Sequence, residues 1–236
     1  MKPVNYCWRP ILAALASVSV WLPGLAHAQG GIPGYPDTIY VFDRREVAML
    51  PRYCIYTQHF REFVPGGNNP EEIQRWGSMM GETFHHLHHY CYGLMFFNRA
   101  TLLAREAHVR RFYLGNAIKE FDYVLQRAPQ EFILLPEVLT KKGETFIKQN
   151  RGALAAEPLE RAIGLKPDYW PPYAYLSDYY RETGDFKRAR QILEAGLSAA
   201  PDAKGLQRRL SELDAAAAKP KSAPPPTRKQ GSAPGG

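Results

Sequence analysis

The chain has 236 residues, which is enough for one moderate domain or for a small domain with a tail. Its formal charge is +7, but six of its 30 basic residues lie near the two ends. The remaining 24 basic residues are nearly balanced by the 23 acidic residues. A nearly neutral body, in a chain that we expect to be exported, argues against a nucleic-acid partner.

Residues 1–28 have the features of a signal peptide. Lys2 and Arg9 precede the apolar run ILAALASVSVWLPGL, which is too short to span a bilayer comfortably, and AHA offers small residues to a signal peptidase. We expect cleavage after Ala28, and therefore a periplasmic or secreted protein that is not an integral membrane protein. The alternative is an uncleaved membrane anchor, which Pro23 within the apolar run disfavours.

The cysteine count changes with export. Cys7 leaves with the leader, and the mature chain keeps Cys54 and Cys91. Two thiols in an oxidising compartment form a disulfide more often than they remain free ligands, so we expect a Cys54–Cys91 bridge. Closing a loop of this length would stabilise the fold by about 3–4 kcal/mol in the chain-entropy model.

Residues 29–83 predict an irregular helical segment that packs on the domain that follows. Asp43 and Glu46 have the spacing of a capping box, which predicts the start of a short helix. Asn69 and Pro70, followed by two acidic residues, predict the start of a second helix. No stretch alternates polar and apolar residues convincingly enough to predict a sheet.

Residues 84–213 have a helical pattern whose punctuation repeats. The last copy combines large residues along one helix face, a small residue where two helices approach, and a closing proline: Tyr173, Leu176, Ser177, Tyr180, Ala189, Leu193 and Pro201. The same landmarks occur 34 residues earlier: Leu139, Lys142, Gly143, Phe146, Ala155, Leu159 and Pro167. Lys142 departs from this pattern, because a leucine is usual there. The pattern resembles the tetratricopeptide repeat, a helical hairpin of about 34 residues.

The resemblance implies an all-α fold in which helical hairpins stack into a solenoid. A looser first copy is formed by His89, Tyr92, Gly93, Phe96, Ala117, Phe121 and Pro129. In this copy 24 residues separate Gly93 from Ala117, where 12 separate Gly143 from Ala155, which predicts a hairpin that protrudes past the stack. After Pro201, KGLQRRLSEL predicts a helix that caps the solenoid. HHYCYGL and KPDYWPPYAYLSDYY are also similar to exported bacterial repeat proteins of undefined role.

Residues 214–236 predict a disordered, basic tail rich in proline and alanine. No aromatic or branched apolar residue occurs from Ala215 onward, so this stretch cannot bury enough surface to offset its ordering entropy. A solvated tether is the simplest interpretation, and contact with acidic envelope polymers is the alternative.

The stretch FHHLHHYCYG, residues 84–93, places four histidines on one helix. We interpret them mainly as amphipathic core residues, because His89 takes the position of a packing aromatic in the repeat. The alternative is a metal site formed by His85, His86 and His89, of which His85 and His89 lie one turn apart. This set lacks the additional carboxylates of a di-iron bundle, and we predict no cofactor.

Catalytic motifs are lacking in the sequence: there is no G-x-S-x-G, no phosphate-binding glycine loop and no free cysteine placed for nucleophilic attack. The repeats instead imply a scaffold or adaptor, not an enzyme, which binds a protein or peptide within an envelope assembly. Stacked hairpins form a concave groove lined by their first helices. The groove residues that we predict are Lys141, Glu144, Lys148, Ala174, Asp178 and Arg181. The second hypothesis is a periplasmic metal-binding protein that uses the three histidines.

Overall fold

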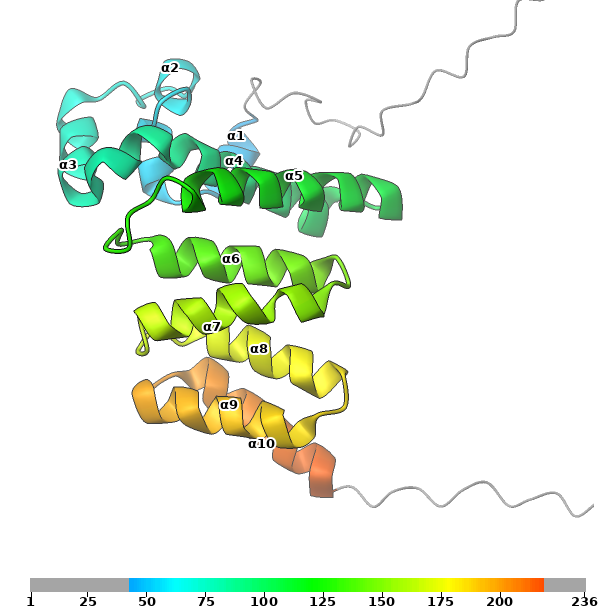
Figure 1. Ribbon diagram of the computed structural model, residues 1–236. Coiled ribbons are helices and arrows are strands. Elements are labelled where there is room, and N and C mark those ends of the chain that lie inside the picture. The colour runs from blue at the N-terminus through cyan, green and yellow to red at the C-terminus, as the bar shows by residue number, and fades with distance from the viewer. Residues whose placement is uncertain (1–42, 219–236) are drawn as a thin grey trace, which may run out of the picture.

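The computed structural model describes residues 43–218, and every regular element in this range is a helix (Figure 1). Five short elements come first: α1 (Arg44–Ala48), η1 (Arg52–Tyr56), α2 (Phe60–Phe63), α3 (Pro70–Met80) and η2 (Gly81–His86). The first hairpin consists of α4 (Leu87–Asn98), η3 (Arg99–Leu103) and α5 (Ala107–Leu125). The second and third are α6 (Leu135–Lys148), η4 (Gly152–Leu154) and α7 (Ala156–Leu165), then α8 (Pro171–Glu182) and α9 (Phe186–Ala199). The final helix is α10 (Lys204–Ala218). The hairpins stack in chain order, as the repeat pattern predicts.

The glycine of the first helix in each of the first two hairpins lies where the two helices come closest. A Cβ atom at Gly143 would lie 2.6 Å from Cγ of Leu159, and one at Gly93 would lie 2.3 Å from the ring of Phe121. Real Cβ atoms do not approach neighbours this closely, because protein interiors are already packed to the density of organic crystals. The first and second hairpins therefore close in the same way, despite their different lengths.

The first hairpin is longer than the other two. Its first arm continues past α4 through the π-helical turn η3, and its second arm, α5, has 19 residues and is the longest of the described helices. Figure 1 shows the N-terminal end of α5 extending beyond the helices stacked beneath it, as the extra residues in the first copy predict. Leu102 and Phe112, near this end, are 64% and 63% exposed.

The N-terminal segment is joined to the first hairpin by a covalent bond and by an ion pair. Cys54 of η1 and Cys91 of α4 form the disulfide that the cysteine count predicts, and both residues are fully buried. Glu46 of α1 accepts two hydrogen bonds from Arg99, at 2.5 Å from Nε and 2.8 Å from Nη2. The segment and the first hairpin share one hydrophobic core.

The expected capping box at the start of α1 is wrong in one of its two halves. The side chain of Asp43 does accept a hydrogen bond from the backbone N–H of Arg45. Glu46, however, is only 1% exposed and binds Arg99 in the core. A carboxylate gains more from a buried guanidinium than from a solvent-exposed backbone N–H, because charge-assisted bidentate hydrogen bonds are the strong ones. The predicted start of α3 is correct, since Asn69 caps it and Pro70 is its first residue.

The last helix continues further than the sequence predicts. The sequence predicts a disordered tail from Asp214 onward, whereas α10 remains helical through Ala218. Alanine has the highest helix propensity, and Asp214 pairs with Arg190 of α9, so both local preference and tertiary contact favour the extra turn. The remainder of the predicted tail, the signal peptide and residues 29–42 lie outside the described residues.

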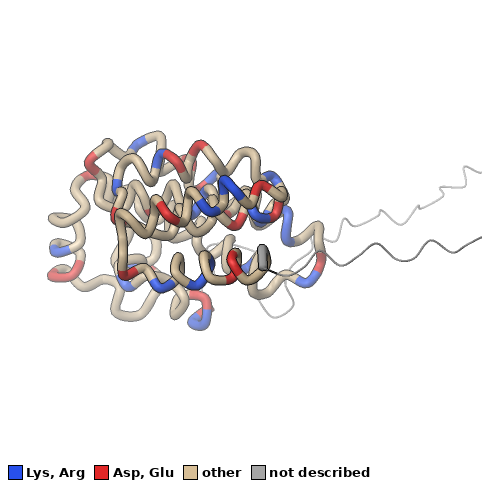
Figure 2. Tube along the Cα trace, turned by 90° about the horizontal axis from the view of Figure 1, so that it is seen from below, with Lys and Arg blue, Asp and Glu red and all other residues tan. Residues whose placement is uncertain are grey.

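Charges of both signs are distributed over the whole described part of the chain. Figure 2 shows Lys and Arg interspersed with Asp and Glu along the helices. Within residues 43–218, no helix combines the length and the apolar character that crossing a membrane requires.

Candidate partner-binding face

The first helices of the second and third hairpins, α6 and α8, pack against each other. The residues that we predicted for a partner-binding groove come from these two helices. We use the name α6–α8 face for a set of charged and tyrosine side chains on these helices and on the loop before α8: Glu137, Lys141, Glu144, Lys148, Tyr169, Tyr175, Asp178 and Arg181.

Lys141 is held in place by groups from two hairpins. Its Nζ lies 2.8 Å from a carboxylate oxygen of Glu144 and 4.9 Å from the centroid of the Phe97 ring, which belongs to α4. The side chain of Lys141 is 30% exposed, whereas that of Glu144 is 10% exposed. A cation over an aromatic ring and beside a carboxylate is attracted by both, so the ammonium group is fixed but still reachable from solvent.

Tyr175 of α8 lies close enough to Glu144 to feel its charge. Burial, and then the negative charge of Glu144, raise the pKa of the Tyr175 hydroxyl well above its ordinary value. This phenol is therefore neutral at physiological pH and can donate a hydrogen bond. Glu144 is thus shared between a cation from its own helix and a tyrosine from the next hairpin, which couples the two repeats.

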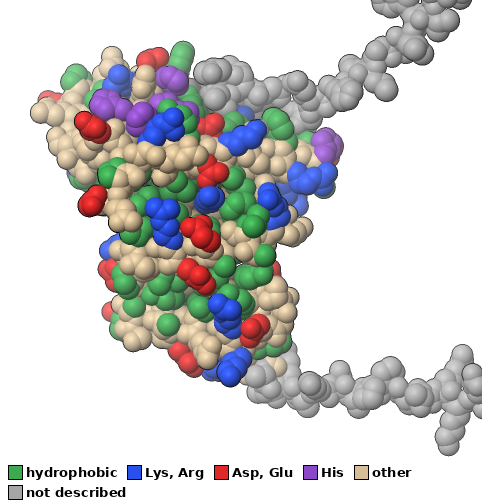
Figure 3. Space-filling view, in the orientation of Figure 1, with side chains coloured by type: hydrophobic (Ala, Val, Ile, Leu, Met, Phe, Trp, Pro, Cys, Tyr) green, Lys and Arg blue, Asp and Glu red, His purple; other side chains and the backbone are tan. Residues whose placement is uncertain are grey.

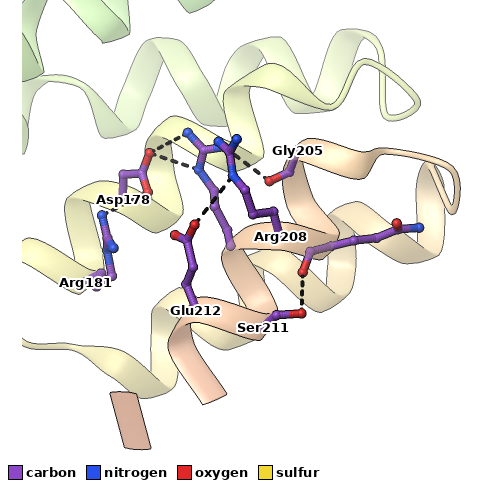
Figure 4. Close-up of polar contacts among 8 residues, drawn as sticks. Asp178, Arg181, Gly205, Arg208, Ser211 and Glu212 are labelled. Atoms are coloured by element: carbon purple, nitrogen blue, oxygen red, sulfur yellow. Dashed lines mark hydrogen bonds and ion pairs between the residues drawn. The ribbon is translucent and has the colours of Figure 1, made fainter. Parts of the chain in front are cut away.

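Two of the predicted groove residues contact the capping helix α10 of the chain itself. Figure 4 shows Asp178 of α8 facing α10, where it accepts hydrogen bonds from Nε and Nη2 of Arg209 at 3.0 and 2.8 Å. Ala174 is 2% exposed and packs in the core that α8 and α9 share with α10, so its side chain cannot contact a partner. The prediction for Ala174 is wrong because α10 packs on the side of α8 that carries Ala174, which the repeat pattern does not show.

Lys148 and Arg181, two other predicted residues, remain accessible, whereas Glu144 is buried. Lys148 is exposed, and the side chain of Arg181 is 43% exposed at 3.4 Å from Asp178. Sequence reasoning missed Tyr175, although it lies 34 residues after Lys141 and therefore occupies the same position of the repeat. The sequence does not predict Arg209 as part of this face, because the pattern indicates only that its helix caps the solenoid.

Comparison with known proteins agrees with the repeat architecture. Residues 146–210 match the family model described as tetratricopeptide repeat. A mouse (Mus musculus) protein, Protein O-mannosyl-transferase TMTC1, is 28% identical over 107 residues, which are 45% of this chain and 11% of that protein. This chain therefore spans about a tenth of the length of that relative.

A similar solved structure is "First TPR of Spaghetti (RPAP3) bound to HSP90 peptide SRMEEVD". It has a TM-score of 0.40 and 15% sequence identity, and it covers 55% of this chain and 96% of its own. The stacked hairpins and the matching family model lead to one conclusion. Residues 146–210 carry the tetratricopeptide repeat (TPR) pattern, and the described hairpins stack in a TPR-like fold.

Outside the α6–α8 face, histidines gather at the N-terminal end of the TPR stack, as Figure 3 shows. A row of ring contacts joins His59, the residue before α2, to α4 and α5. The centroids lie 4.7 Å apart for His59 and His88, 4.3 Å for His88 and His89, and 3.6 Å for His89 and Tyr123; the first two pairs are tilted and the last is stacked. His59 comes from the N-terminal segment and has a positive φ of 68°. Nδ1 of His89 lies 2.6 Å from Glu120. The row therefore links the N-terminal segment to both arms of the first hairpin.

The alternative metal site does not form in this arrangement. Among residues 43–218, no three His, Cys, Asp or Glu side chains are grouped so that they could hold a metal ion. His89 is instead stacked on Tyr123, and the His86 ring lies 5.9 Å from the same tyrosine. Cys91 is bonded to Cys54 and has no thiolate to offer. The amphipathic histidines thus pack against aromatic rings.

Proposed function

We propose that this chain is an exported TPR scaffold or adaptor, not an enzyme, that binds a protein partner on its α6–α8 face within an envelope assembly. The observation that carries the proposal is the position of Lys141, which is fixed between Glu144 and Phe97 yet remains 30% exposed. A charge that is held in place before binding loses little side-chain entropy when a partner pairs with it. Lys148 and Arg181 add accessible charges on the same face.

Both signs of charge on this face suit a polar protein segment. Glu144 and Asp178 are paired within the chain, whereas no ion pair of Lys148 occurs in residues 43–218. Complementary charges at the rim of an interface mainly set the association rate and the choice of partner, rather than the affinity itself. We therefore expect binding that weakens as salt is raised.

Export is supported by the disulfide. Cys54 and Cys91 are both fully buried and bonded, and disulfides persist in oxidising compartments such as the periplasm. The mass of the mature chain isolated from the cells that make it tests this part of the proposal. We expect a chain that begins at Gln29 and contains the bridge. A reduced chain that still begins at Met1 would contradict export.

The binding proposal is tested by comparing two charge-reversed forms of the full mature chain. One form carries Lys148→Glu and Arg181→Glu on the α6–α8 face. The control carries Arg161→Glu and Lys187→Glu, two exposed residues on the second helices α7 and α9. Both forms change the net charge equally. Each would replace the wild-type chain in its own organism, and co-purifying proteins would be quantified by mass spectrometry after mild cross-linking.

We expect the wild type and the control to retain the same partner and the face variant to lose most of it. Retention of this partner by the face variant, or equal loss from the control, would refute the α6–α8 face as the binding surface. Circular dichroism of both forms reports whether the helices remain folded.

A further inference from the structure

Glu137, in the first turn of α6, is a carboxylate without a cation. It is half-buried, and it accepts a hydrogen bond from the hydroxyl of Tyr90 at 2.7 Å. Within residues 43–218, no Lys, Arg or His forms an ion pair with Glu137, whereas Glu144, two turns later on the same helix, is paired with Lys141. The positive end of the α6 dipole favours an acidic residue here but does not neutralise it.

Three tyrosines from three different segments feel the charge of this carboxylate. Burial is the main cause that raises the pKa of Tyr53, Tyr90 and Tyr169, and the negative charge of Glu137 is the next cause for all three. The pKa of Tyr169 reaches about 12, and all three hydroxyls are neutral at physiological pH. Tyr90 is fully buried, and Tyr169 in the loop before α8 is partly exposed.

One of these tyrosines lacks a hydrogen-bond partner. Tyr53 of η1 is 8% exposed, and its buried hydroxyl makes no hydrogen bond within the described part of the chain. Buried polar groups are nearly always paired, so an unpaired hydroxyl that feels the charge of a carboxylate without a counter-ion indicates a site that is completed by something else. A hydroxyl oxygen accepts hydrogen bonds from N–H donors, as a carboxylate does.

We propose that Glu137, which accepts a hydrogen bond from Tyr90 and has no counter-ion in residues 43–218, binds a lysine or arginine side chain that the protein partner presents to the α6–α8 face. This inference rests on the proposed function, because it names the chemistry of the partner. The carboxylate supplies the opposite charge, and the partly exposed Tyr169 supplies an aromatic ring that attracts a cation.

The chain itself contains an example of this chemistry one turn along α6. Lys141 lies between the carboxylate of Glu144 and the ring of Phe97, at 2.8 and 4.9 Å. The site at Glu137 likewise has a carboxylate and a partly exposed aromatic residue that feels its charge, Tyr169, but no cation within residues 43–218 pairs with it. A basic side chain from a partner would supply it and would extend the alternation of charges along the face.

The test uses small charged probes on the full mature chain. Nα-acetyl-lysine N-methylamide and Nα-acetyl-arginine N-methylamide are titrated while the ring signals of the tyrosines are followed by NMR. The matched control probe is the lysine compound acetylated on Nε, which keeps the alkyl chain and loses the charge. We expect saturable, millimolar binding of the charged probes that moves the signals of Tyr90 and Tyr169, and no such effect of the neutral probe.

Two variants assign the binding to Glu137. Glu137→Gln should weaken binding of the charged probes about tenfold or more, which corresponds to about 1.4 kcal/mol. Glu160→Gln, an exposed glutamate of α7, removes the same charge elsewhere and should leave binding unchanged. If Glu137→Gln fails to fold, Tyr169→Leu removes one aromatic wall at a partly exposed position and should weaken binding several-fold.

Equal binding of the neutral and charged probes would overturn the inference, as would full binding by Glu137→Gln or by Tyr169→Leu. This failure is distinct from failure of the proposed function. If the probes do not bind but Lys148→Glu with Arg181→Glu still abolishes partner capture, only the cation site is refuted. If that double variant captures the partner normally, the α6–α8 face is refuted whatever the probes do.

Discussion

Replacing Glu46 by glutamine should destabilise the protein by about 3–5 kcal/mol, which is the usual cost of leaving a buried charge without its counter-ion. Glu46 and Arg99 are 1% and 0% exposed, and two hydrogen bonds of 2.5 and 2.8 Å join them. Glutamine keeps the volume of the side chain but removes its charge. Nη1 of Arg99 already lacks a hydrogen-bond partner within residues 43–218. Such a loss is a large fraction of the roughly 5–15 kcal/mol that stabilise a typical domain.

The assay is urea unfolding at pH 7, followed by far-UV circular dichroism under non-reducing conditions. Asp168→Asn serves as the control, because it removes a pair with Lys166 in which both side chains are largely exposed, and it should have little effect. The double variant Glu46→Gln with Arg99→Met buries no charge and should recover much of the lost stability. If Glu46→Gln unfolds at the same urea concentration as Asp168→Asn, Arg99 does not occupy a dry, charged site and our reasoning is wrong.

Three further predictions concern packing, the disulfide and pH. Gly143→Ala should destabilise the protein by about 1–3 kcal/mol, because the new Cβ would lie 2.6 Å from Leu159. Gly115→Ala meets open space in α5 and should stabilise the protein by about 0.5–1 kcal/mol. Thermal melts of the two variants test this pair of predictions. Replacing both Cys54 and Cys91 by alanine should cost about 3–4 kcal/mol in urea unfolding, and an unchanged midpoint would contradict a role of the bridge in stability. Burial, and then the neighbouring His89 and His59, lower the pKa of His88 from 6.5 to about 4. The unfolded chain therefore binds more protons than the folded one between these values, so stability should fall as pH is lowered from about 6.5 to 4. His88→Asn should flatten this dependence, and an unaltered slope would assign it to other groups.

The sequence predicted the repeat architecture well because its signals are local and periodic. The spacing of 34 residues links Gly143 to Ser177, and it is fixed by the need for two helices to approach at a small residue. The extended first hairpin could be predicted for the same reason, since the extra residues keep a helical pattern. The disulfide followed from counting the cysteines that remain after the expected export.

Contacts between distant segments could not be predicted in this way. Glu46 lies 53 residues before Arg99, and local spacing therefore suggested a capping role for it. The fold of the N-terminal segment likewise brings His59 against His88, and no periodic pattern in the sequence predicts this contact.

The candidate site was predicted only in part, for a related reason. Lys141 and Glu144 lie one turn apart on α6 and do form a pair. Ala174 and Asp178 were assigned to the accessible face because the repeat pattern describes single hairpins, and it does not show which helix packs beside them. Arg209 of α10 donates hydrogen bonds to Asp178, and Glu137 accepts one from Tyr90, which lies 47 residues earlier in the sequence.

The most direct test of the central claim places a photo-cross-linking amino acid at position 148 of the full chain, in the organism that makes it. The same residue at position 187, on the second helix of the last hairpin, serves as the matched control. We predict that position 148 forms a covalent adduct with one protein partner after illumination, and that position 187 does not. An adduct with the same partner from position 187 but not from position 148 would contradict binding on the α6–α8 face.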